Sequence, residues 1–160
     1  MVRRAGAEKE SGMVKKLFVY YSHTGNGEAV AAYLAQNGYD LRRVTPKREL
    51  PRPFFCKMMQ GGFLAGISYR APLVGFDADV TDYDAVTVGM PVWNGRPACP
   101  VNTALQALDL TGKQVSFVLY AGGGTAPKAV KKLHRLYPNA PVTVLKEPKK
   151  YPDELQKITL

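Results

Sequence analysis

The sequence predicts an α/β fold, with a parallel sheet that carries helices on both faces. Apolar segments typical of strands alternate along the chain with segments of helical periodicity, which is the order of βαβ units. The chain has 160 residues and no internal repeat, which suits one domain with a buried core. Residues 1–12 are charged and lack periodicity, so we expect a disordered leader there and a single domain at 13–160.

The N-terminal part predicts a strand, a helix and a second strand. The first strand is expected at residues 14–21, which are mainly apolar and aromatic. A helix is expected at 26–37 because its apolar residues share one face, and Gly38 suits the position just after its C-terminus. The second strand is expected at 39–44.

The C-terminal half predicts three more strands, at 84–89, 114–120 and 142–145. A third helix is indicated from Val101 onward, where apolar residues recur at i, i+3, i+4 and i+7. A fourth helix follows Thr125, which suits an N-cap. These elements complete the alternation of strands and helices.

Two segments are harder to interpret. Prolines interrupt residues 46–83, and within them 54–64 is the candidate for the second helix. The tail at 152–160 offers only Leu155 and Ile158 as an apolar face. Either the closing helix is short, or another segment covers this part of the sheet.

Composition and charge exclude several classes of protein. The formal net charge is +9, which favours anionic partners or a solvated basic surface. The basic residues are scattered and no nucleic-acid motif organises them, so we expect no nucleic-acid partner. No apolar run reaches the roughly 18 residues of a membrane helix, and no secretory signal is visible. Cys56 and Cys99 have no metal or redox spacing, which suits reduced thiols in a cytoplasmic protein.

A loop of hydroxyls and glycines at residues 22–27 joins the first strand to the first helix. Backbone N–H groups and the helix dipole favour an anion at such a helix start. Ser22, Thr24 and Asn26 add neutral donors, so the loop predicts a phosphate ligand. No lysine follows the glycines as in a P-loop, and Val30 stands where a dinucleotide fingerprint needs glycine. The glycines also suit a plain tight turn.

Three segments, in the right order, resemble the flavodoxin family. Tyr-Ser-x-Thr-Gly-Asn from Tyr21 resembles the loop that binds the phosphate of FMN. Residues 84–95 resemble the third strand and the tryptophan-bearing loop that covers the flavin, and 117–125 resemble the fourth strand and the second flavin loop. The resemblance covers residues 14–145. It implies a flavodoxin-like three-layer α/β/α sandwich with a five-stranded parallel sheet in the order 2-1-3-4-5.

These three loops follow the carboxyl ends of strands, where open α/β sheets bind their ligands. Trp93 would stack on the flavin ring, or it would be a packing residue of a surface loop. We assign no catalytic residue and no metal ligand. The resemblance implies FMN as the cofactor and the following residues as its binding site: Ser22, His23, Thr24, Gly25, Asn26, Gly27, Pro91, Val92, Trp93, Asn94, Gly95, Ala121, Gly122, Gly123 and Gly124.

The chain departs from the family pattern at two places. The family usually has a threonine, whose hydroxyl binds phosphate, where this chain has Gly27. The second flavin loop often carries a stacked tyrosine, whereas residues 121–124 contain no aromatic side chain. The first departure implies weaker FMN binding, and the second implies that one face of the flavin is open.

Three functions remain under comparison. The favoured one is electron transfer between redox partner proteins, acidic ones in view of the basic charge. The alternative is an FMN-dependent NAD(P)H oxidoreductase of the quinone or flavin reductase type, which would make NAD(P)H a partner. The third is a binding module of the same architecture without flavin.

Overall fold

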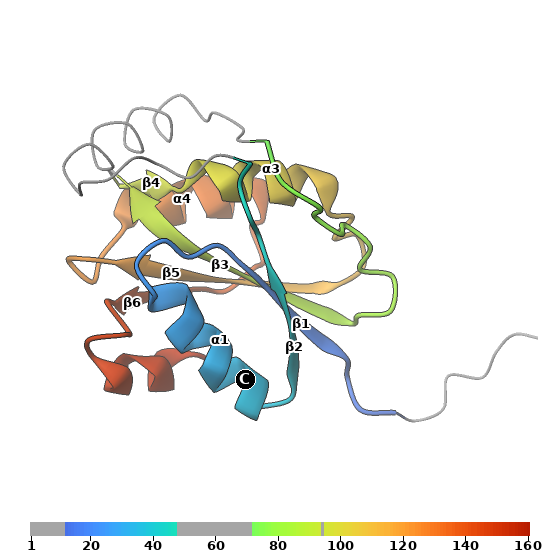
Figure 1. Cartoon of the computed structure of the whole chain (residues 1–160), viewed down its shortest axis with the longest axis horizontal. Coiled ribbons are helices and arrows are strands. Elements are labelled where there is room, and N and C mark those ends of the chain that lie inside the picture. Colours follow the sequence, from blue (N-terminus) through green and yellow to red (C-terminus); the bar gives the residue numbers. More distant parts are fainter. Residues whose placement is uncertain (1–11, 48–71, 94) are drawn as a thin grey trace, which may run out of the picture.

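The computed structural model describes residues 12–47, 72–93 and 95–160. Five parallel strands form a sheet in the order β2–β1–β3–β5–β6 (Figure 1). Counted along the chain, these parallel strands stand in the order 2-1-3-4-5, so the predicted fold class is confirmed. The strands are β1 (Lys16–Tyr20), β2 (Tyr39–Arg43), β3 (Ala85–Trp93), β5 (Gln114–Ala121) and β6 (Val142–Lys146).

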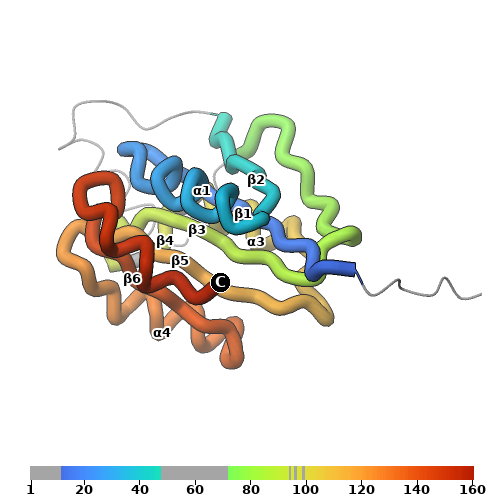
Figure 2. Tube along the Cα trace, turned by 90° about the horizontal axis from the view of Figure 1, so that it is seen from below, coloured from blue at the N-terminus to red at the C-terminus, as the bar shows by residue number. Residues whose placement is uncertain are grey.

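Helices cover both faces of the sheet and give three layers (Figures 1 and 2). On one face lie α1 (Asn26–Gln36) and a short 3-10 helix, η1 (Pro152–Lys157). On the other lie α3 (Cys99–Ala107) and α4 (Pro127–Leu136). No helix among the described residues is long and apolar enough to cross a membrane.

The central strands alternate between two cores. Leu17 and Val19 of β1 belong to the core beneath α3 and α4, whereas Phe18 and Tyr20 belong to the core beneath α1. In β5 the residues alternate in the same way between these two cores. Because both faces of a parallel sheet are covered, its strands are apolar on both sides. This explains why the central strands β1, β3 and β5 are largely apolar in the sequence.

Several boundaries differ from the predicted ones. The third strand was expected to end at residue 89, but β3 continues to Trp93 because its end pairs with the two-residue strand β4 (Arg96–Pro97) in an antiparallel hairpin. Helix α4 begins at Pro127 with Ala126 in the N-cap position, so Thr125 is not the cap. The expected helix at 54–64 lies outside the described residues, as do residues 1–11 of the expected leader.

A cavity of about 680 Å³ lies at the amino end of the sheet. The start of β5, the connection from α4 to β6 and the C-terminal residues 158–160 line it. The closing helix η1 has six residues, so of the two alternatives for the tail the structure shows the short helix. The three predicted ligand loops lie at the opposite, carboxyl end of the strands.

Candidate flavin site

The three predicted loops follow the carboxyl ends of β1, β3 and β5. These strands are neighbours in the sheet. After β1 the chain adds β2 on one side of β1, and it then adds β3 on the other side. Such a switch in strand order is where open α/β sheets bind ligands. The fold therefore gathers the predicted residues, which come from three distant parts of the sequence, at one edge.

The first loop turns into α1 at Gly25. This residue has φ +94°, a left-handed conformation that favours glycine, and its carbonyl accepts the first helical bond, from the N–H of Ala29, at 3.2 Å. No side chain caps the helix at this position. The N-cap residue itself thus supplies no side-chain bond to this eleven-residue helix, although the Ser22 hydroxyl accepts one first-turn N–H, that of Gly27. The remaining first-turn N–H groups are of the kind that binds anions.

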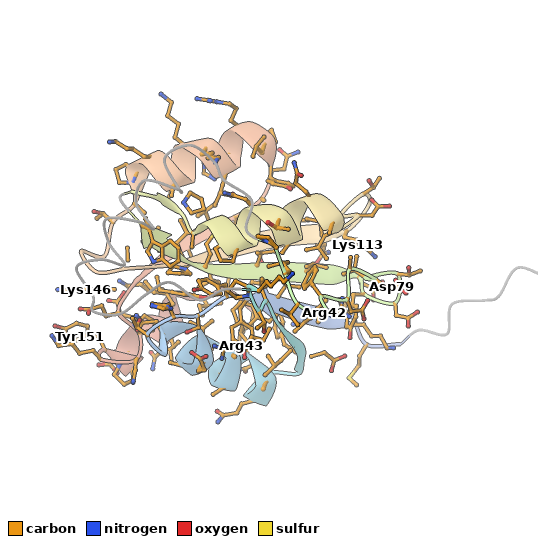
Figure 3. The ribbon with its side chains drawn as sticks, turned by 45° about the horizontal axis from the view of Figure 1, so that its top comes forward. Arg42, Arg43, Asp79, Lys113, Lys146 and Tyr151 are labelled. Atoms are coloured by element: carbon orange, nitrogen blue, oxygen red, sulfur yellow. The ribbon has the colours of Figure 1, made fainter. Side chains whose placement is uncertain are left out.

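Ser22 braces this loop from inside. Its hydroxyl oxygen accepts the N–H of Gly27 at 3.1 Å, and its own proton goes to the carboxylate of Glu28. Arg43, at the end of β2, donates to the Ser22 carbonyl at 3.3 Å and pairs with the Glu28 carboxylate. Figure 3 shows Arg43 beside α1. The hydroxyl and the carbonyl of Ser22 are therefore both bonded within the protein.

Glu28 is ionised at neutral pH. Burial on its own would raise the pKa of this carboxyl. Hydrogen bonds from Ser22 and from the backbone, together with the charge of Arg43, outweigh burial and hold the pKa below its ordinary value. A partly exposed ion pair thus adjoins the first loop through its bonds to Ser22.

Thr24 and Asn26 form the exposed side of the loop. Asn26 donates from Nδ2 to the Thr24 hydroxyl at 3.3 Å, and its Oδ1 accepts the backbone N–H of Lys149 at 3.1 Å. Thr24 is exposed. Its oxygen accepts this bond, and its own O–H can donate to a ligand.

Gly27 cannot carry a side chain in this arrangement. A Cβ at this position would lie 2.5 Å from Ser22 Cβ and 2.8 Å from the Tyr120 hydroxyl. That hydroxyl is buried and donates to the carbonyl of Tyr21. Ser22 and Tyr120 together therefore occupy the space that a threonine would need, which gives a physical reason for the departure at position 27.

The second loop is the β3–β4 hairpin, where the sequence predicted an irregular loop. Trp93 lies in its last paired position and meets Tyr21 edge-on, with ring centroids 5.8 Å apart and planes at 89°. It meets His23 in the same way, at 6.2 Å and 87°. Gly95 has φ +72° and makes the turn. The second loop thus contacts the first through its tryptophan; Asn94 lies outside the described residues.

The third loop leaves its backbone open. Ala121 ends β5 and is buried, and the N–H of Gly124 closes a turn onto its carbonyl at 3.1 Å. A Cβ on Gly122 or Gly123 would meet no atom within 4 Å. A flat ligand can therefore approach this backbone closely.

Three exposed lysines outside the predicted site each lie against a positive-φ glycine of a different loop. A Cβ on Gly25 would lie 3.0 Å from Lys149 Cδ, and one on Gly95 would lie 3.5 Å from Lys128 Cδ. A Cβ on Gly124 would lie 3.2 Å from Lys146 Cβ. The sequence analysis missed these lysines, and it missed Tyr120 and Arg43 as well. No local motif marks them, because pairing between distant segments brings them to the loops.

The described residues include no group of three or more His, Cys, Asp or Glu side chains that could hold a metal ion. The site therefore consists of a braced phosphate-type loop, an aromatic hairpin, an open glycine loop and a surrounding set of lysines.

Comparison with known proteins decides the family. The flavodoxin sequence model matches residues 15–157. The chain belongs to the flavodoxin family. No curated protein sequence matches the chain.

Solved structures with this flavodoxin architecture include two bacterial proteins. One, from Bacteroides eggerthii and assigned as a flavoprotein, is 23% identical over 89% of this chain and 98% of its own, with a TM-score of 0.73. The other, a flavoprotein of Lactobacillus acidophilus solved in complex with FMN, is 19% identical over 88% of this chain and 98% of its own, with a TM-score of 0.67. Both support the fold, and the predicted cofactor agrees with the family.

The crowding at position 27 leads to a stability prediction. We expect Gly27→Ala to destabilise the protein by about 1–3 kcal/mol, the usual cost of overpacking a core. Tyr120→Phe removes the hydroxyl that crowds this position and also a buried hydrogen bond. Because the two changes share this contact, the double variant should lose less than the sum of the single losses. Urea unfolding of the four proteins measures the coupling.

Gly122→Ala is the matched control, since a Cβ there meets open space, and it should leave the unfolding midpoint unchanged. Strictly additive losses at positions 27 and 120 would contradict the contact between Tyr120 and Gly27.

Proposed function

We propose that this chain binds FMN between its three loops and carries electrons between redox partner proteins. The observation that supports this best is the braced anion loop at the start of α1, in a member of the flavodoxin family. Its backbone is fixed by Ser22, Glu28 and Arg43, while the exposed Thr24 hydroxyl is available as a donor. Bound FMN would supply the electron-transfer chemistry.

Each loop has a different task in this proposal. Thr24, Gly25 and Asn26 would bind the phosphate, and Ser22 with Gly27 would hold the loop in shape from inside. His23 and the hairpin at 91–95 would border the flavin ring, with Trp93 as its aromatic contact. The third loop, 121–124, would bring backbone N–H groups to the ring edge, for which its open glycines provide room.

The basic charge supports acidic proteins as the redox partners. Helix α4 contains no acidic residue, and it carries Lys128, Lys131, Lys132, His134 and Arg135. Lys128 lies against Gly95 of the second loop, so this helix borders the proposed flavin. Complementary charge speeds encounter and orients partners. A partner with an acidic patch would thus dock where electrons can transfer.

One observation favours the alternative, an FMN-dependent NAD(P)H oxidoreductase. The third loop has no aromatic side chain and leaves its backbone exposed, so a second planar ligand has access to the flavin, and the lysines around it would attract an anionic nucleotide. Steady-state oxidation of NADH or NADPH by the purified FMN-loaded protein distinguishes the oxidoreductase from the electron carrier. Turnover without a partner protein supports the enzyme, and its absence supports the carrier.

Phosphate recognition tests the FMN proposal. FMN should bind much more tightly than riboflavin, which lacks the phosphate. Thr24→Ala should weaken FMN binding by about 1–3 kcal/mol, the range for leaving a charged group short of a hydrogen bond, and should affect riboflavin little. Thr159→Ala, at the opposite end of the sheet, is the matched control. Equal affinity of the wild type for both flavins would refute the assignment.

Trp93 is the only tryptophan and should report on the flavin. We expect its emission to fall as apo protein is titrated with FMN, and the bound flavin to be quenched as well. Trp93→Ala should weaken FMN binding by about 0.5–1.5 kcal/mol beyond the loss of burial. If tryptophan emission stays unchanged at saturating FMN, Trp93 serves only to pack on Tyr21 and His23.

The charge around the site should shift the reduction potential. Reduced flavin in this family is an anion, and nearby lysines stabilise an anion. We expect a less negative potential than in an acidic flavodoxin, with a difference that shrinks as salt screens the lysines. Spectroelectrochemical titration at low and high salt measures it. Lys128→Glu with Lys146→Glu should lower the potential; an unchanged, salt-independent potential would show that these lysines do not act on the flavin.

A further inference from the structure

Lys149 lies across the first loop, although it comes from the turn after β6. Three consecutive atoms of its side chain follow the Gly25 backbone: the position of a Cβ on Gly25 lies 3.0 Å from Cδ, 3.4 Å from Cε and 3.1 Å from Nζ. Any side chain at position 25 would push the lysine away. The glycine thus permits both the left-handed turn and the approach of a cation.

The backbone of Lys149 is fixed to the same loop. Its N–H donates to Asn26 Oδ1 at 3.1 Å, which joins the C-terminal turn to the start of α1. The turn is closed by the N–H groups of Lys150 and Tyr151, which both donate to the carbonyl of Glu147 at 2.8 and 3.0 Å. In Figures 1 and 2 this turn comes up against the start of α1.

Glu147 has φ +36°, and no other non-glycine residue in the described ranges has a positive φ. Residues held in this region cost about 1–3 kcal/mol and persist where the surroundings enforce them. Here the enforced turn brings Lys149 to the loop. The ammonium groups of the neighbouring lysines lie elsewhere. Nζ of Lys146 and of Lys150 lies over the Tyr151 ring, at 5.1 and 5.2 Å from its centroid (Figure 3 labels Lys146 and Tyr151).

The charge of Lys149 is available to a ligand. None of the ion pairs among the described residues includes it, and Glu28, in the first turn of α1, is paired with Arg43. The donors of the loop itself are neutral. A single ammonium group therefore stands on a loop that otherwise binds an anion through hydrogen bonds and the helix dipole alone.

We propose that Lys149 is the counter-ion of the flavin phosphate and the residue that makes this site select phosphorylated flavin. The proposal rests on the proposed binding of FMN and adds a cation from outside the three flavin loops. Its ammonium would pair with the phosphate oxygens, and its backbone N–H would keep Asn26 in place. The two roles are separable, because only the first needs the side-chain charge.

The test compares Lys149→Gln with Lys150→Gln, an adjacent exposed lysine whose ammonium lies over Tyr151 instead. Lys149→Gln keeps the backbone bond to Asn26 and most of the stem, and removes the charge. Dissociation constants for FMN and riboflavin are measured by flavin fluorescence at low and high salt. We expect Lys149→Gln to weaken FMN about tenfold at low salt, in the range of a charge-assisted hydrogen bond, and less at high salt.

Riboflavin binding by Lys149→Gln should stay at the wild-type value, Lys150→Gln should bind both flavins normally, and Lys149→Arg should retain FMN. An unchanged FMN affinity in Lys149→Gln overturns the inference while FMN binding stands. An equal loss for riboflavin also overturns it, because it would show a structural role. If the wild type itself fails to bind FMN, the proposed function fails, and the role of Lys149 fails with it.

Discussion

The hydrogen bond from Tyr120 to the carbonyl of Tyr21 is the constraint on which the candidate site depends. The N–H of Tyr21 donates to Gly89 of β3 at 3.1 Å, so its backbone is held from β3 and from β5 at once. The Tyr120 hydroxyl fills the space beside Gly27, and without a Cβ there the N–H of Gly27 reaches Ser22. Burial raises the pKa of Tyr120 well above its ordinary value, so the hydroxyl stays a donor.

Charged groups of two kinds lie at this edge of the sheet. Next to the first loop, Arg43 and Glu28, both partly exposed, form a pair that fixes the backbone and adds no net charge. Lysines from α4, β6 and the following turn lie against glycines of the loops. Several lysines therefore border this edge, in contrast to the acidic surface usual for flavodoxins. A short-range network shapes the site, while the outer cations act over longer distances on anionic partners.

Local sequence patterns predicted the alternating strands and helices and the first loop, because periodicity and glycine-rich turns are properties of neighbouring residues. The strand order and the other two loops were implied by the resemblance to flavodoxins. The extension of β3 to Trp93 was missed, since it depends on pairing with β4 across a turn. The coupling of Gly27 to Tyr120 could not be predicted either, because they meet only when β5 comes beside the β1 loop. Lys149 was missed for the same reason: its contact with Asn26 spans 123 positions of sequence.

The bond between Lys149 and Asn26 joins the two ends of the described fold. The C-terminal segment rests on the sheet chiefly through Ile158, which is buried, and Leu155, which is partly so. Since no residue of η1 is fully buried, this segment is a natural place for local opening. Opening it would release the first loop, and ordering the loop would hold the segment closed. Ligand binding at the first loop should therefore increase the protection of the C-terminal segment from proteases and from hydrogen exchange, although the two are far apart in the sequence.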